Sequence, residues 1–323
     1  MPIINPVFNT KNETEKTQYD LIIIGGGPAG LAAGIYASRA RLSCAIIERL
    51  SPGGQIILSD RVENYPGFVE GISGTELGMK LEQHARKFGT EFIYDEVTSV
   101  RKNNNNFEII TSQKTFYSYA VIIATGASYK HLDVPGEKKF TGKGVSFCAT
   151  CDGAFFKNKN VAVIGGGDTA IQEAIYLTKF ASKVFIIHRR DALRATRILQ
   201  DEAFSNPKIT FIWNSVVREI NGKDRVESLK LENIKNNEIS NLATDGVFIF
   251  VGIQPHSEFV KDLIKRDENG YIIVDANMQT SVPGIFAAGD VIKSPLRQVV
   301  TSVAEGAIAS FVAEDYIRRL ARS

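Results

Sequence analysis

The chain has 323 residues, a length typical of two globular domains. Apolar residues make up 44% and charged residues 23%, as in proteins with a full hydrophobic core. The 38 basic and 36 acidic residues almost cancel, and the net charge of +2 excludes a general electrostatic attraction to nucleic acid. Only three cysteines are present, which argues against a secreted disulfide scaffold and is typical of a reducing compartment.

The N-terminal segment, residues 1–18, is polar and contains Glu13 and Glu15. It has no apolar core, which argues against a signal or transit peptide. No run in the chain approaches the ~18 consecutive apolar residues of a membrane span. We therefore expect a polar extension at the N-terminus, and a cytoplasmic protein with no membrane partner.

The first elements form a β-α-β unit. Residues 19–24 are typical of a buried strand, residues 28–41 of a helix and residues 43–47 of a second strand, which predicts a parallel sheet with a right-handed crossover. Residues 51–71 are rich in Gly, Pro and Ser, so we expect a loop there. Alternating apolar positions predict a β-meander, with a further buried strand after it, at residues 90–100, 106–111, 114–120 and 121–124.

The same pattern then restarts with a strand at residues 160–164, a helix at 169–180 and a strand at 184–187. Such a repeat indicates an internal duplication of a dinucleotide-binding unit. Further strands are predicted at residues 208–213, 226–231 and 247–251.

The last segment, from about residue 254, is too short for a third domain and is expected to complete the first one. It contains a predicted strand at 271–274, the glycine-containing stretch 284–290 and a helix from Gln298. We therefore predict an α/β fold with two Rossmann-like three-layer dinucleotide-binding domains, the second inserted in the first. The expected ranges are 19–127 with 254–323 for the first domain, and 128–253 for the second.

The first glycine fingerprint follows the first strand directly. Gly25 permits the tight turn, Gly27 lets backbone N–H groups approach a pyrophosphate, and Gly30 allows close packing of helix on strand. Glu48 ends the second strand, where its carboxylate can accept hydrogen bonds from a ribose diol and would repel a 2′-phosphate. The alternative is a purely structural glycine turn. The fingerprint also contains Pro28 and Ala29.

The second fingerprint repeats this geometry but lacks the acid at the strand end. Its turn residues are Gly165, Gly167, Asp168 and Thr169, with Ala170 in place of the third glycine. After the strand the chain has His188 and three guanidinium groups, which suit a phosphate better than a free diol; they belong to Arg189, Arg190 and Arg194. This difference predicts an NAD-like first site and an NADP-like second site. A solvated basic turn is the alternative.

Between the two fingerprints lie Cys148 and Cys151, followed at once by Asp152. A zinc site would need two more ligands, but Cys44 lies in a predicted buried strand and the four histidines show no ligand spacing, so no metal is predicted. A redox-active pair needs a reactive thiolate and an acid to protonate the departing thiolate, and Asp152 can supply that proton. Cys148, Cys151 and Asp152 are therefore the predicted catalytic residues.

These motifs closely resemble the low-molecular-weight bacterial thioredoxin reductases, which belong to the pyridine nucleotide-disulfide oxidoreductases. The resemblance runs from about residue 19 to 320. It includes both fingerprints, the CxxC-Asp motif, the arginine cluster and the stretches 53–55, 62–67, 124–126 and 287–290.

The resemblance implies that electrons pass from NADPH through FAD and the dithiol to oxidised thioredoxin, with a homodimer as the usual state. Cys151 is then the thiol that faces the flavin, Cys148 attacks the partner disulfide, and Asp152 donates the proton. The inserted domain rotates about linkers near residues 127–129 and 251–254. Further FAD-binding positions are implied at Gly54, Gln55, Asn64, Ala124, Gly126, Gly289, Asp290, Arg297, Gln298 and Val299, and the 2′-phosphate positions at Arg189, Arg190 and Arg194.

Two departures from the family pattern affect the surface that docks thioredoxin. The family often has two aromatic residues after Cys-Asp-Gly, whereas this chain has Ala154 and then Phe155 and Phe156. Lys143 stands where a docking arginine is common. Both departures concern which partner is bound and how tightly.

Two other kinds of function remain open from the residues alone. The first is a related enzyme that draws electrons from ferredoxin or oxidises small dithiols with oxygen, and the arginine cluster argues against the ferredoxin version. The second is a flavin-carrying redox sensor that does not turn over. Intact sites for both nucleotides, together with Asp152, argue against that sensor.

Overall fold

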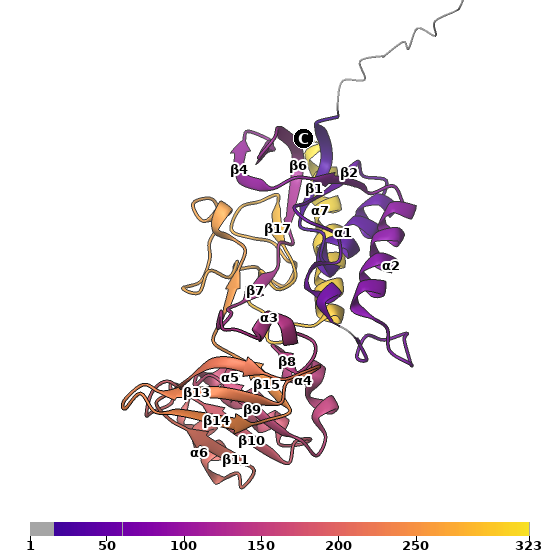
Figure 1. Cartoon of the computed structure of the whole chain (residues 1–323). Coiled ribbons are helices and arrows are strands. Elements are labelled where there is room, and N and C mark those ends of the chain that lie inside the picture. The colour runs from indigo at the N-terminus through magenta and orange to yellow at the C-terminus, as the bar shows by residue number, and fades with distance from the viewer. Residues whose placement is uncertain (1–15, 60, 323) are drawn as a thin grey trace, which may run out of the picture.

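The computed structural model describes residues 16–59 and 61–322, and these residues form two sheet-centred parts, one above the other in Figure 1. Residues 1–15 of the predicted polar extension lie outside the described residues, whereas Gln18 already belongs to the first strand. In the described part of the chain, no helix combines the length and the apolar character needed to cross a membrane.

The first sheet has seven strands in the order β3-β2-β1-β6-β5-β4, and β17 also pairs with β6. β3, β2, β1, β6 and β17 run parallel, whereas β4 and β5 form an antiparallel extension along the first half of β6. The strands are β1 (Gln18–Ile24), β2 (Cys44–Glu48), β3 (Glu91–Tyr94), β4 (Val97–Asn103), β5 (Asn106–Thr111), β6 (Thr115–Ile123) and β17 (Ile285–Ala287).

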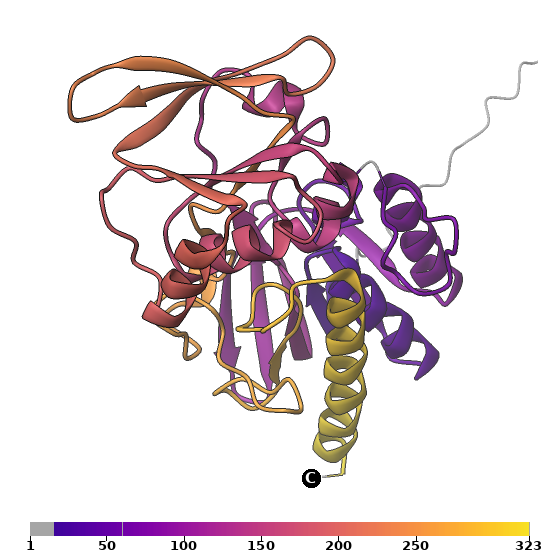
Figure 2. The same cartoon turned by 90° about the horizontal axis from the view of Figure 1, so that it is seen from below.

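Both faces of the first sheet are buried. Ile22 and Ile24 of β1 belong to one core cluster, and Leu21 and Ile23 belong to the other, as the alternation of side chains along a strand requires. The helices of this part are α1 (Pro28–Arg39), α2 (Gly74–Lys87) and α7 (Val299–Leu320). α1 and α7 approach closely because Gly306 of α7 lies against the backbone of α1, where a Cβ would collide with a carbonyl. Figure 2 shows α7 running away from the second part toward the C-terminus.

The second sheet is entirely parallel, with the order β11-β10-β9-β15-β8. A separate antiparallel sheet, β12-β13-β14, packs against it, and the residues between them form one core cluster. All of these strands lie in the sequence between β6 and β17 of the first sheet, which confirms the predicted insertion of one dinucleotide fold into another. The strands are β8 (Val145–Ser146), β9 (Asn160–Ile164), β10 (Lys183–Ile187), β11 (Ile209–Ile212), β12 (Ser215–Asn221), β13 (Ser228–Asn233), β14 (Ile239–Ala243) and β15 (Gly246–Ile249).

Short helices complete this second part and the connections. The α-helices are α3 (Glu137–Phe140), α4 (Ala149–Asp152), α5 (Asp168–Leu177) and α6 (Arg197–Ser205). Three 3₁₀ turns lie at η1 (Gly54–Leu58), η2 (Gly153–Phe156) and η3 (Glu258–Val260).

Two short strands join the parts, β7 (Ala127–Tyr129) and β16 (Ile253–Pro255), and they pair with each other in antiparallel fashion. The side chains of Ser128 and His256 form a hydrogen bond of 2.6 Å beside this ribbon. Thr125 donates its hydroxyl to the His256 carbonyl at 2.6 Å. The two chain segments that link the parts are therefore hydrogen-bonded to each other and form one narrow connection.

Several predicted elements are wrong in detail. Residues 90–100 form two strands rather than one, because β3 pairs with β2 and the chain then breaks at Asp95, whose carboxylate accepts bonds from the neighbouring loop. Residues 114–124, predicted as two strands, form the single strand β6. The predicted loop at 51–71 contains η1, and helix α2 and the strands β12 and β14 were not predicted.

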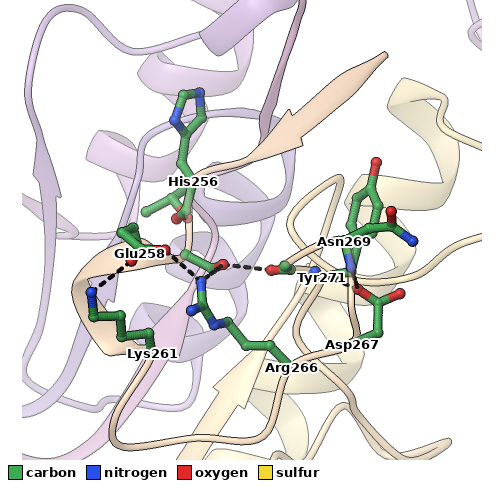
Figure 3. A network of polar contacts seen from close by, with 10 residues as sticks. His256, Glu258, Lys261, Arg266, Asp267, Asn269 and Tyr271 are labelled. Carbon is green, nitrogen blue, oxygen red and sulfur yellow. Dashed lines mark hydrogen bonds and ion pairs between the residues drawn. The ribbon is translucent and has the colours of Figure 1, made fainter.

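The strand predicted at 271–274 is also wrong. Only Ile272 forms isolated bridges, and the backbone N–H of Tyr271 donates instead to the Asp267 carboxylate at 2.9 Å, closing a turn (Figure 3). Arg266 extends this network by donating to Glu258 at 3.0 Å. The side-chain bonds of the turn replace the ladder that a strand would need.

Candidate active site

Cys148 and Cys151 form a disulfide at α4, with their Cα atoms 5.3 Å apart. The backbone N–H of Cys151 points at the Cys148 sulfur, 3.2 Å away. Helix α4 therefore presents one backbone donor to the sulfur that the resemblance identifies as the nucleophile, and such a donor stabilises a thiolate.

Asp152 is held beside the disulfide by Ser146 of β8. The Ser146 hydroxyl donates to Oδ2 of Asp152 at 2.6 Å and accepts the backbone N–H of Cys148 at 3.1 Å. Ser146 is 4% exposed. A single buried hydroxyl thus orients the predicted proton donor relative to the predicted nucleophile.

A cavity of about 1450 Å³ joins the first fingerprint to the disulfide. This volume exceeds the ~300–1,000 Å³ of ordinary ligand pockets, as a site for an extended dinucleotide requires. Cys148, Cys151 and Asp152 line it together with fifteen of the sixteen residues predicted for the first cofactor. Those fifteen are Gly25, Gly27, Pro28, Ala29, Glu48, Gly54, Gln55, Asn64, Ala124, Gly126, Gly289, Asp290, Arg297, Gln298 and Val299.

Gly30 does not line the cavity. It lies against the backbone of Gly25, where any Cβ would collide with the Gly25 carbonyl. Gly25 itself has a φ of 104°, which favours glycine. Gly30 therefore acts through helix–strand packing, the role that the fingerprint gives it.

Glu48 lies at the end of β2 facing the glycine turn. Its Oε2 accepts the backbone N–H of Gly26 at 2.7 Å, and its Oε1 accepts that of Leu50 at 2.8 Å. These two bonds fix the carboxylate at the cavity wall while each oxygen keeps capacity for another donor. This pair of acceptor oxygens fits the two hydroxyl donors of a ribose diol.

The charged residues near the start of α7 are partly desolvated. Burial raises the pKa of Asp290, and the Arg297 guanidinium partly offsets this rise. Burial, with a smaller contribution from Asp290, raises the pKa of Tyr129 to about 12. Arg297 stacks over the ring of Tyr271 at 4.8 Å, and among the described residues its buried Nε has no hydrogen-bond partner. An unpaired buried donor in the cavity wall fits a site that accepts a polar cofactor.

The second fingerprint lies elsewhere. Gly165, Gly167, Asp168 and Thr169 follow β9 and open α5, and neither they nor the three arginines line the large cavity. The turn and the arginine segment are nevertheless brought together, since the backbone N–H of Arg194 donates to the Gly166 carbonyl at 2.7 Å. The three arginines of this segment, Arg189, Arg190 and Arg194, are exposed.

His188 occupies the place that Glu48 has in the first copy, at the end of the second strand. A Cβ on Gly166 would lie 2.5 Å from its imidazole, just as a Cβ on Gly26 would lie 3.2 Å from the Glu48 carboxylate. Burial, reinforced by Arg194, lowers the pKa of His188, so this side chain is neutral at neutral pH. At Gly167 a Cβ would meet no atom within 4 Å, so the backbone of the turn borders open space there.

The sequence interpretation missed several residues of the site. Ser146 lies two residues before Cys148, and its position would have been the only clue to its bond with Asp152. Glu305 of α7 accepts the backbone N–H of Gly289 at 2.8 Å, a contact that no local pattern predicts. Tyr129 lines the cavity from β7. Each of these residues reaches the site through tertiary packing.

Comparison with known proteins agrees with this arrangement. The family model of the pyridine nucleotide-disulphide oxidoreductases matches residues 19–306. A thioredoxin reductase of Bacillus subtilis is 48% identical over 95% of this chain and 97% of its own length. The thioredoxin reductase structure from Streptococcus pyogenes is 49% identical and superposes with a TM-score of 0.91, covering 94% of this chain and 99% of its own.

A second solved structure superposes on this chain less well over its whole length. The Lactococcus lactis thioredoxin reductase in its FR conformation is 45% identical and covers 93% of this chain and 99% of its own, yet its TM-score is 0.64. This chain is thus an oxidoreductase with a redox disulfide beside a dinucleotide fold. It belongs to the pyridine nucleotide-disulphide oxidoreductase family, among the thioredoxin reductases of low molecular weight.

Proposed function

We propose that the chain reduces oxidised thioredoxin with electrons from NADPH, by way of FAD and the Cys148–Cys151 disulfide. The observation that supports this most directly is the single cavity that contains both the first glycine turn and the disulfide. When bound there, FAD would supply a centre that accepts a hydride and passes two electrons on to a disulfide. Glu48, Asp290 and Arg297 are the polar side chains placed to hold it.

The chain's own residues account for the exchange with the partner. The Cys148 thiolate attacks one sulfur of the partner disulfide, forms a mixed disulfide and releases a partner thiolate, which takes its proton from Asp152. Cys151 then attacks Cys148, which restores the Cys148–Cys151 disulfide and releases the second partner sulfur. Ser146 orients Asp152 for the proton transfer through its 2.6 Å bond.

NADPH is proposed for the second fingerprint, where exposed arginines replace the acid found in the first. That turn does not line the cavity of the disulfide, so hydride transfer requires another arrangement of the two parts. The structures from Streptococcus pyogenes and Lactococcus lactis are similarly identical to this chain, at 49% and 45%, but their TM-scores are 0.91 and 0.64. This difference supports such a rearrangement. The paired strands β7 and β16 are the proposed hinge, with domain limits at 127/128 and 253/254.

Thioredoxin is the proposed partner, and its proposed docking surface includes Lys143, which is exposed at the cavity mouth, and Phe155, which is 44% exposed. A homodimer is proposed through the exposed apolar face of α7, where Ile308 and Phe311 are 41% and 69% exposed. We propose a cytoplasmic location, where thiols stay reduced.

The test is an absorbance and turnover experiment on the FAD-loaded protein. NADPH is expected to bleach the flavin, and oxidised thioredoxin is expected to restore its colour with continued NADPH consumption. In the Cys148→Ser variant, NADPH should still bleach the flavin, but oxidised thioredoxin should not sustain NADPH consumption. Bleaching by reduced ferredoxin but not by NADPH would support the ferredoxin-dependent alternative. Bleaching without turnover on any thioredoxin or glutaredoxin-like protein would favour the sensor, and oxygen-linked dithiol oxidation would favour the oxidase.

A further inference from the structure

A polar bridge connects the disulfide to the start of α7. Nε2 of Gln298 donates to the Thr150 hydroxyl at 3.2 Å and lies 3.8 and 3.7 Å from the sulfurs of Cys148 and Cys151. On its other side, Oε1 of Gln298 accepts Nδ2 of Asn64 at 2.9 Å. One carboxamide is therefore held between the loop after η1 and the disulfide loop.

This bridge joins the two parts of the molecule away from the hinge. Thr150 lies in α4, next to β8 of the second sheet, whereas Gln298 directly precedes α7, which packs on the first sheet. The bond between Ser128 and His256, by contrast, lies in the hinge itself. Because it lies outside the hinge, the Gln298–Thr150 bond must break whenever the disulfide leaves the cavity.

Packing around the bridge is loose. A second cavity of about 250 Å³ lies beside it, lined by Asn64, Thr150, Leu296, Gln298, Val299 and Val300. Leu296 and Val300 are 46% and 41% exposed, so little apolar surface is buried at this contact. The hydrogen bonds of the carboxamide are therefore a substantial share of what holds the disulfide loop here.

We propose that Thr150 is a positioning residue, and that its hydroxyl, through Gln298, sets the share of molecules whose disulfide faces the first cavity. We call the Gln298–Thr150 hydrogen bond the latch. This inference rests on the proposed function, because only an enzyme that alternates between two arrangements needs a bond that must break and re-form. Thr150 does not line the large cavity, so its side chain can be changed without removing a predicted cofactor contact.

The decisive variant is Thr150→Val, which keeps the shape of the side chain but removes the hydroxyl. Loss of one partly exposed hydrogen bond is expected to raise the ratio of the second arrangement to the first about two- to tenfold. Thr150→Ser retains the hydroxyl and is expected to behave as the unmodified chain. Thr98→Val is the matched control, since Thr98 lies on β4 and its hydroxyl is also exposed but bonds to the Ile110 carbonyl of β5.

Two measurements on the FAD-loaded proteins report the population. Small-angle X-ray scattering gives the fraction of each arrangement without any substrate, and stopped-flow bleaching by NADPH should accelerate by the same two- to tenfold in Thr150→Val. The Thr150 hydroxyl also lies 3.4 Å from the Cys148 sulfur, so the reduction potential of the Cys148–Cys151 pair, measured in glutathione buffers, separates a direct effect on the disulfide from an effect on the arrangement. Unchanged scattering in Thr150→Val would overturn the latch, as would an effect of Thr150→Ser or of Thr98→Val as large as that of Thr150→Val.

Failure of the proposed function would look different. If NADPH does not bleach the flavin of the unmodified protein, the proposed electron donor is wrong, yet scattering still decides whether Thr150 biases the arrangement. If NADPH bleaches all variants equally and scattering is also unchanged, the proposed function stands and the latch does not.

Discussion

Ser146 and Asp152 are joined by a hydrogen bond of 2.6 Å between the hydroxyl of one and Oδ2 of the other. The two residues lie on either side of the disulfide, at β8 and at the end of α4. Since Ser146 also accepts the N–H of Cys148, the hydroxyl relates the proton donor directly to the nucleophile. The orientation of Asp152 is therefore set by the second sheet as well as by its own helix.

Ser146→Ala should slow thiol exchange without affecting the NADPH half of the reaction. Removing a bond to a carboxylate, worth about 1.5–3 kcal/mol, leaves Asp152 present but misoriented, so a roughly tenfold fall in kcat with thioredoxin is expected. Asp152→Asn, which removes the proton itself, should cost ~10²–10⁴-fold. Stopped-flow and steady-state rates separate the two halves, and a slower flavin bleaching in Ser146→Ala would contradict this assignment.

Glu48→Gln should weaken FAD binding. The glutamine can still accept one backbone N–H, but Glu48 now accepts those of both Gly26 and Leu50 and has charge to offer a ribose diol. Loss of charge-assisted bonds predicts a rise in the FAD dissociation constant of about ten- to a hundredfold. Fluorescence titration of the apoprotein measures it. NADPH affinity should not change, and an equal loss of both nucleotides would indicate general unfolding instead.

Replacing Arg189 and Arg190 by Leu together should reverse the coenzyme preference. Their guanidinium groups are exposed beside the second glycine turn, in the place where a 2′-phosphate is expected. A fall of kcat/KM for NADPH of roughly a hundredfold or more is expected from the loss of charge-assisted bonds, with little change for NADH. Arg101→Leu, an exposed arginine on β4, is the control. Equal losses with both coenzymes would refute a phosphate-specific role.

Glu305 gives a testable pH dependence of stability. Burial raises its pKa, although the bond from Gly289 partly offsets the rise. The folded apoprotein therefore holds this proton to higher pH than the unfolded chain does. Its contribution to stability is full below the unfolded value of about 4.3 and is lost as the pH rises through the folded pKa.

Urea unfolding of the apoprotein at several pH values checks this sign. The stability of the unmodified chain relative to Glu305→Gln should decline as the pH rises from about 4 upward. Gln keeps an oxygen that can accept the N–H of Gly289, so the variant is expected to fold. Glu227→Gln, at an exposed position, should run parallel to the unmodified chain. A parallel course for Glu305→Gln would show that its carboxyl is not desolvated.

Gly166→Ala should disturb the second site through His188. The new Cβ would lie 2.5 Å from the buried imidazole, which must move, and a destabilisation of about 1–3 kcal/mol is expected. The KM for NADPH should rise as the turn shifts. The double variant Gly166→Ala with His188→Ala removes the clash and should recover part of the lost stability relative to the sum of the single changes. Strict additivity would show that the strain lies elsewhere.

Much of the fold followed from local sequence patterns. The strands at β1 and β9 are continuous apolar runs that end in glycine turns. Both were predicted because an apolar run and the turn that ends it are local properties of the sequence. Helix α2 was not predicted, since only a few of its positions are buried. Its capping signal was nevertheless present, because the Ser73 side chain accepts the N–H of Glu76.

Other elements could not be predicted locally. Residues 114–124 contain no local signal that decides whether they form one strand or two. They form the single strand β6 because β1 pairs along nearly all of it. At 271–274 the local apolar pattern favours a strand, but the backbone of Tyr271 bonds to Asp267 instead. A strand needs continuous pairing, and the fold pairs only Ile272 of this stretch with its neighbours.

By itself the sequence determined the duplicated dinucleotide fold, the inserted order and the family, because glycine turns, apolar runs and adjacent reactive residues are short-range features. It also predicted the chemistry of the CxxC-Asp motif. Tertiary structure alone decided which fingerprint shares a cavity with the disulfide. Gln298 reaches Cys151 across 147 residues of sequence, and Ser146 meets Asp152 through the packing of β8 and α4. The Gln298 contact depends on how the two sheet-centred parts lie against each other, and no local pattern encodes that placement.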